Sequence, residues 1–110
     1  MFVIAALYHF SRFDDPAALK PGVLEVCEKN GVMGTLLLAP EGVNGTVSGP
    51  RSGIDAVLAH IRTLPGCSDL EWKEATSDRR PFGKMKVRIK DEENEKGDAE
   101  KEQPEAKPED

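Results

Sequence analysis

The last twenty residues of the chain, 91–110, confine any fold to the 90 residues before them. They contain no aromatic residue and no aliphatic side chain larger than alanine. A segment of this kind cannot bury enough apolar surface to offset the conformational entropy that ordering would cost. We therefore predict one domain over residues 1–90, followed by a disordered acidic tail over residues 91–110.

The charge of the chain is divided at the same point. The tail holds ten acidic residues and three lysines, a net charge of −7, whereas residues 1–90 hold ten acidic residues and twelve lysines or arginines, a net charge of +2. The overall charge of −5 thus describes the tail, and the domain itself is weakly basic. The tail either competes with a polyanion for the domain or keeps the chain soluble, and we favour the second role.

The N-terminal segment and the cysteines indicate a cytoplasmic protein. The first ten residues are apolar over only seven positions, without a basic lead or a small-residue cleavage site, and are too short to span a bilayer. Cys27 and Cys67 belong to no metal-binding or disulfide pattern, so we expect two reduced thiols packed in the core. The expected location is the cytoplasm, with no membrane partner.

The order of the hydrophobic segments predicts an α+β ferredoxin-like fold. Strands are expected at residues 2–10, 32–39, 43–48, 70–75 and 83–90. The first helix should run from Pro21 to about Asn30, after a short turn at residues 16–20. The second should begin after Pro50, with an apolar stripe of Ile54, Val57, Leu58, Ile61 and Leu64. This βαββαβ order places two helices on one face of an antiparallel sheet, which the last strand extends or lines.

The last predicted strand carries the pattern most informative about function. Cationic and apolar side chains alternate along residues 83–90, so the cations share one face of the strand. With two arginines just upstream they form the basic stripe, which comprises Arg79, Arg80, Lys84, Lys86, Arg88 and Lys90. Such a stripe favours contact with the phosphates of a nucleic acid. Lysines on an edge strand also prevent edge-to-edge pairing, and the sequence leaves both roles open.

An acylphosphatase-like hydrolase is a weaker alternative. That chemistry needs a cradle of backbone N–H groups, an arginine that holds the anion and an asparagine that places water. Arg12 and Asn44 are of the required types. The segment after the first strand contains no glycine, however, and its Asp14 and Asp15 would repel a phosphate. Glu41, an isolated acid, has no second carboxylate at a fixed spacing.

The remaining candidates have structural interpretations that we favour. No pair of histidines and cysteines has the spacing of metal ligands, so we predict no metal site from His9, His60, Cys27 and Cys67. Tyr8 and Phe10 share a face of the first strand and could stack on bases if that face is open, although aromatics on a central strand more often belong to the core.

The segment "GTLLLAPEGVNGTVSG" combines a hairpin with a glycine-containing turn. Glu41, Gly42, Asn44 and Gly45 gather near its tip, which suggests a ligand-binding loop. Placed between two predicted strands, the same residues form a hairpin motif whose glycines serve backbone geometry or a close approach. We favour this interpretation.

Four segments resemble one known family. They are "ALYHFSRFDDPAAL", "GVMGTLLLAPEGVNGTVSG", "GIDAVLAHIR" and "PFGKMKVRIK". These segments closely resemble the N-terminal domain of the bacterial rhodanese-related tRNA uridine hydroxylases, also known as rhodanese-like sulfurtransferases. The resemblance covers residues 2–90 and implies an acylphosphatase-like version of the ferredoxin-like fold. In the family this domain precedes a rhodanese domain, and the whole protein is implicated in oxygen-dependent hydroxylation of a tRNA wobble uridine.

The resemblance implies an accessory role rather than catalysis by this chain. The family's rhodanese domain and its active-site cysteine do not follow residue 90, so no catalytic residue can be placed here. We expect no cofactor and no activity from the chain alone. The implied function is a non-catalytic domain that assists tRNA binding through the basic stripe. The alternative is a protein-interaction module that docks on the rhodanese domain.

Overall fold

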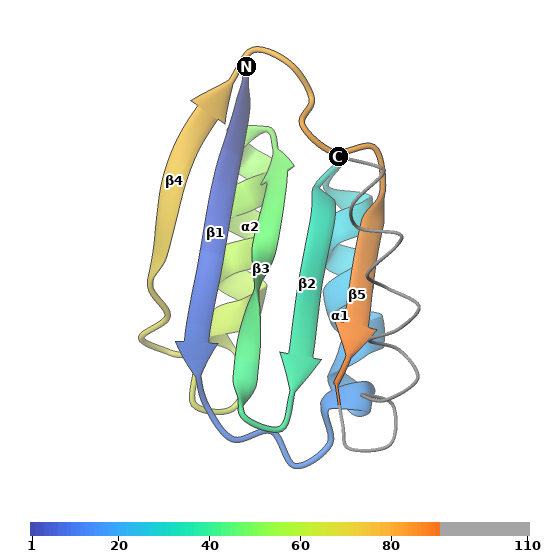
Figure 1. Ribbon diagram of the computed structural model, residues 1–110, viewed down its shortest axis with the longest axis vertical. Helices are drawn as coiled ribbons and strands as arrows, with labels where there is room; N and C mark the ends of the chain where they lie inside the picture. The colour runs from blue at the N-terminus through green and yellow to red at the C-terminus, as the bar shows by residue number, and fades with distance from the viewer. Residues whose placement is uncertain (91–110) are drawn as a thin grey trace.

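The computed structural model describes residues 1–90, in which two helices pack on a five-stranded sheet (Figure 1). In chain order the elements are β1 (Phe2–Phe10), α1 (Pro16–Lys29), β2 (Met33–Ala39), β3 (Gly42–Gly49), α2 (Arg51–Arg62), β4 (Trp72–Ser77) and β5 (Met85–Ile89). The strand order is β4-β1-β3-β2-β5. Strands β1 to β4 pair antiparallel, and β5 pairs parallel with β2 at one edge. The predicted ferredoxin-like fold is confirmed; the predicted tail lies outside the described residues.

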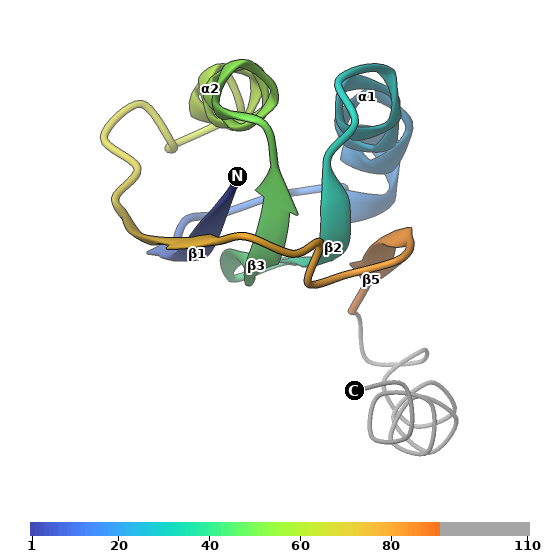
Figure 2. The ribbon, with the colours of Figure 1, turned by 90° about the horizontal axis from the view of Figure 1, so that it is seen from above.

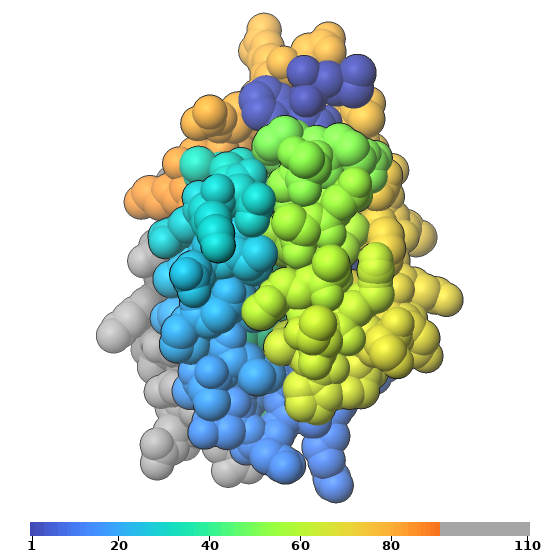
Figure 3. Space-filling model, turned by 180° about the vertical axis from the view of Figure 1, so that it is seen from behind, coloured from blue at the N-terminus to red at the C-terminus, as the bar shows by residue number. Residues whose placement is uncertain are grey.

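Both helices lie on the same face of the sheet (Figure 2). Seen from behind, α1 and α2 lie side by side over the strands (Figure 3). Alternate strand residues point into the layer between helices and sheet, where the core lies. On β1 these are Val3, Ala5 and Leu7, which are all buried. No helix of residues 1–90 covers the opposite side, which we call the open face.

Helix α1 departs from the prediction because it continues through Pro21. The helix spans Pro16–Lys29 without the predicted break. Pro21 removes one backbone donor and crowds the carbonyl group of Ala17. Both residues are exposed, so water can hydrogen-bond to that carbonyl group. Burial of Val23 and Cys27 then holds the following turns on the sheet.

Helix α2 follows the predicted apolar stripe. Ile54, Val57, Leu58 and Ile61 are buried within the helix, and Leu64 is buried in the turn that follows it. The stripe is what attaches α2 to the sheet, because the rest of the helix surface is polar or small. Within residues 1–90, neither helix has the length and apolar character that a membrane crossing needs.

The last two strands differ from the prediction, because β4 is shifted by two residues from the expected 70–75 and β5 is shorter than the expected 83–90. Strand β4 begins at Trp72, because Leu70 is buried in the preceding turn, where its N–H donates to the carbonyl group of Cys67 over 3.1 Å. In β5 the side chain of Val87 is buried, and Met85 and Ile89 pack against the core beside it. The apolar face of the last strand therefore anchors it beneath α1.

Gly45 has a backbone conformation that other residues rarely adopt. Its φ angle is +146°, and it lies in the middle of β3 between Leu7 of β1 and Leu36 of β2. A Cβ atom at this position would collide with the carbonyl oxygen of Thr35. Glycine is therefore required where β2 and β3 approach each other.

We expect Gly45→Ala to destabilise the domain by about 1–3 kcal/mol, because the strained φ angle and the backbone collision act together. Denaturant unfolding followed by circular dichroism measures the change. Gly83→Ala is the matched control, since a Cβ atom there meets nothing within 4 Å. Equal stability of the two variants would contradict the assigned role of Gly45.

An ion pair joins the start of α2 to β4. The guanidinium group of Arg51 donates to both carboxylate oxygens of Glu74, over 2.8 and 3.1 Å. The indole N–H of Trp72 donates to the same carboxylate over 2.9 Å. The hydrogen bonds from Arg51, and then from Trp72, lower the pKa of Glu74 from its ordinary value of 4.5 to about 2.

The lowered pKa of Glu74 predicts a contribution to stability that depends on pH. The stabilisation is fully present above the unfolded-state pKa near 4.5, and it is lost as the pH falls through the folded-state pKa near 2. In the Glu74→Gln variant, the free energy of unfolding should therefore fall less steeply than in the parent as the pH is lowered through this range. Chemical unfolding at several pH values measures the effect, and parallel profiles for variant and parent would refute it.

Candidate nucleic-acid interface

The pairing register arranges the side chains of the open face in rows across the sheet. One row consists of Tyr8 on β1, Asn44 on β3, Leu37 on β2 and Arg88 on β5. The next row consists of Lys73 on β4, Ala6 on β1, Thr46 on β3, Thr35 on β2 and Lys86 on β5. Each of these rows ends in a cation on β5. The sequence did not predict that Lys73, Thr35 and Leu37 belong to this face. Alternation along one strand does not show which strand pairs with it or in which register.

Tyr8 and Phe10 belong to the open face and not to the core. Their exposed fractions are 67% and 69%. The preference for a core position was therefore wrong, because helices cover only the other face of β1. The two rings contact each other edge to face, with centroids 5.0 Å apart and ring planes at 62°. Because exposed apolar patches are a feature of interaction sites, the pair makes this end of the open face a candidate contact surface.

The basic stripe follows two borders of the open face. Arg79 and Arg80 are exposed in the connection that passes over the end of the sheet from β4 to β5 (Figure 1). Lys86 and Arg88 are half-buried within β5, on the face away from α1. Lys90 follows β5, and its ammonium group lies 3.3 Å from the carboxylate of Glu41. The structure thus groups the cations of β5 along one edge and sets the two arginines at the end of the sheet.

The hairpin motif holds the segment after β1 in place. The backbone N–H of Ser11 donates to the carbonyl group of Glu41 over 2.9 Å, and that of Phe13 donates to Pro40 over 3.0 Å. Gly42, with a φ angle of +143°, has no room for a Cβ atom beside the carbonyl group of His9. The turn of the hairpin therefore acts through its backbone and gives no sign of acid–base chemistry.

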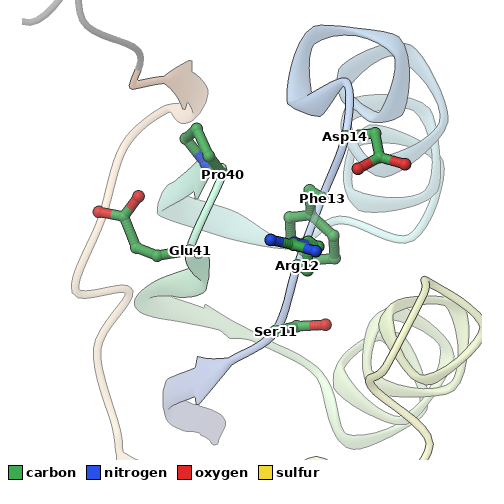
Figure 4. A pocket seen from close by; sticks show the side chains of 6 residues that line it. All are labelled: Ser11, Arg12, Phe13, Asp14, Pro40 and Glu41. Carbon is green, nitrogen blue, oxygen red and sulfur yellow. The ribbon is translucent and has the colours of Figure 1, made fainter.

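The same hydrogen bonds argue against acylphosphatase chemistry. A shallow cavity of about 520 Å³ lies beside Arg12 and is lined by Ser11, Arg12, Phe13, Asp14, Pro40 and Glu41 (Figure 4). Two N–H groups that could form a phosphate cradle already donate to the hairpin turn. The carboxylates of Asp14 and Glu41 repel an anion, and Asn44 lies on the open face instead. The required groups do not converge.

The histidines and cysteines form no cluster of metal ligands within residues 1–90, with or without acidic side chains. His9 hydrogen-bonds through Nε2 to the carbonyl group of Gly66 over 2.8 Å. Cys27 and Cys67 are free and fully buried. Burial, aided by the charge of Glu28, raises the pKa of Cys27 to about 12, and burial also raises the pKa of Cys67.

Both thiols should therefore react slowly with a thiol reagent at pH 8 in the folded domain, because only the thiolate is nucleophilic. After unfolding in guanidinium both should react rapidly. Colour release from 5,5′-dithiobis(2-nitrobenzoate) measures the rates, and Cys27→Ser and Cys67→Ser assign each phase. A fast phase in the folded protein would show that one thiol is more accessible and more acidic than its burial implies.

A four-stranded antiparallel core in the order β4-β1-β3-β2, with two helices on one face, defines the class of ferredoxin-like α+β domains. Solved structures share this fold. The acylphosphatase from Bacillus subtilis matches with a TM-score of 0.60 at 12% identity, over 79% of this chain and 98% of that chain. The BLUF protein BlrB in its dark state matches with a TM-score of 0.63 at 22% identity, over 80% of this chain and 70% of that chain. Identities this low show the fold alone.

Within this class, the chain belongs to the family described as the UPF0176 acylphosphatase like domain, which matches residues 2–92. The chain is 73% identical over 90 residues to the tRNA uridine(34) hydroxylase of Roseobacter denitrificans. It is 48% identical over 91 residues to that of Agrobacterium fabrum. These alignments cover 82% and 83% of this chain, but 30% and 29% of the relatives. The chain thus spans less than a third of the length of these relatives, and it corresponds to their N-terminal region.

Proposed function

We propose that this domain helps a tRNA uridine hydroxylase to hold its tRNA and contributes no catalytic residue itself. The observation that carries the proposal is the basic stripe, which borders a sheet face that no helix of residues 1–90 covers. The relatives at 48–73% identity are named tRNA uridine(34) hydroxylases, and this supports tRNA as the proposed polyanion. A domain that works on tRNA in this way belongs in the cytoplasm.

Charge is the physical basis of the proposed contact. Residues 1–90 carry a net charge of +2, and the basic stripe holds six of their twelve cations. Cations near a phosphate backbone release condensed counterions, and this release supplies affinity without sequence selectivity. The domain would add affinity to the enzyme, while another part of the enzyme selects the uridine.

Replacing Lys84, Lys86 and Arg88 together by glutamine should weaken tRNA binding and flatten its dependence on salt. The slope of the logarithm of the association constant against the logarithm of the salt concentration should fall by about 2 to 3. Fluorescence anisotropy with labelled tRNA at several salt concentrations measures the slope.

The control is Lys20→Gln with Lys29→Gln, which removes two exposed cations from α1 on the opposite face. Its slope should stay close to that of the parent. A thermal unfolding curve for each variant separates lost binding from lost folding. If the triple variant and the control have the same slope, the basic stripe does not contact tRNA and the proposal fails.

The exposure of Tyr8 and Phe10 favours one competing function, in which the open face docks on the rhodanese domain of a full-length relative. Aromatic side chains are enriched at the centres of such interfaces. In that case, alanine replacements of these residues in the full-length protein would lower modification activity while tRNA affinity stays unchanged. In the proposed function, the basic stripe controls both quantities.

A further inference from the structure

The row of Tyr8, Asn44, Leu37 and Arg88 combines the contacts that an unpaired nucleotide uses. An aromatic ring provides a stacking surface, a side-chain amide can pair with a base edge, and a guanidinium group binds phosphate. The residues come from four different strands and are aligned by the register of the sheet.

The two aromatic rings are arranged to meet different bases. They are about two-thirds exposed, and their planes meet at 62° with centroids 5.0 Å apart. A flat base therefore cannot lie on both rings at once. Phe10 is next to Gly42, and Gly42 is next to Ala39, so its row contains no bulky neighbour on β3 or β2. A base on Phe10 therefore meets little steric obstruction from β3 and β2.

The dimensions of the sheet suit a short single strand. Tyr8 and Arg88 are separated by three strand spacings, about 14 Å in all. Asn44 and Leu37 occupy the interval between them. A backbone that crosses the face in this direction would leave its bases over β1 and β3 and bring its phosphates towards β5. A sheet of this strand order can hold about two or three bases on exposed aromatics.

We propose that the open face binds unpaired nucleotides of RNA, with bases stacked on Tyr8 and Phe10. Asn44 hydrogen-bonds to a base edge, and Lys86 and Arg88 attract the phosphates. This inference rests on the proposed role in tRNA binding, and it names single-stranded RNA as the part of the ligand that this face contacts. Lys86 and Arg88 favour RNA over a protein partner, since cations beside a phosphate backbone gain affinity from released counterions.

The test compares oligouridine with an RNA duplex of equal length, using the 110-residue chain. Oligouridine should bind more tightly than the duplex, because paired bases cannot stack on a protein ring. Tyr8→Ala and Phe10→Ala should each weaken oligouridine binding by about 5- to 100-fold without changing the salt slope. Tyr8→Phe retains the ring and should bind nearly as well as the parent.

A second readout reports on stacking itself. Tyr8 is the only tyrosine in the chain, so its ring resonances are unambiguous. Nuclear magnetic resonance titration with oligouridine should shift them upfield, whereas a purely structural role of Tyr8 would leave them in place. Because both aromatic side chains are exposed, the alanine variants should remain folded, which their amide spectra would show.

The outcomes separate this inference from the proposed function. If the alanine variants bind oligouridine as well as the parent while the triple variant of the basic stripe flattens the tRNA salt slope, stacking is wrong and the tRNA role stands. If the aromatic variants weaken binding but the triple variant keeps its slope, the base contact stands without the phosphate stripe. If the alanine variants instead abolish a dimer of the chain and leave RNA affinity unchanged, the open face is a self-interface and this inference is overturned.

Discussion

Packing of two helices against a single face of the sheet is the constraint on which the rest of the domain depends. Val3, Ala5 and Leu7 point into the layer beneath the helices, together with the buried stripe of α2. A chain segment of about 90 residues has enough material for one such layer. The other face therefore carries side chains that are not part of this core, among them the exposed Tyr8 and Phe10.

The hairpin between β2 and β3 explains how this fold can be shared with acylphosphatase while the chemistry differs. The carbonyl groups of Pro40 and Glu41 accept hydrogen bonds from Phe13 and Ser11. Backbone donors engaged in this way cannot also surround a phosphate. The nearby acidic side chains add repulsion, so this end of the sheet lacks the phosphate cradle that acylphosphatase chemistry needs.

Strand β5 places positive charge along one edge of the open face. Val87 is buried beneath α1, which fixes the strand beside β2 and directs Lys86 and Arg88 to the opposite side. The same alternation serves two purposes at once. Apolar residues attach the strand to the core, and cations at an edge discourage pairing with another sheet. In the proposed function the same cations attract RNA.

The sequence by itself determined the order of the elements, because the periodicity of apolar residues reflects burial on one side of each helix or strand. The sequence also predicted the apolar stripe of α2 and the alternation in β5, and it carried the resemblance to the family. It could not show that α1 continues through Pro21, since tertiary packing of Val23 and Cys27 outweighs one lost hydrogen bond. Only the tertiary structure decided that Tyr8 and Phe10 face outward and that Tyr8, Asn44 and Arg88 share a row. Strand register joins residues far apart in the chain, and no local pattern encodes that pairing.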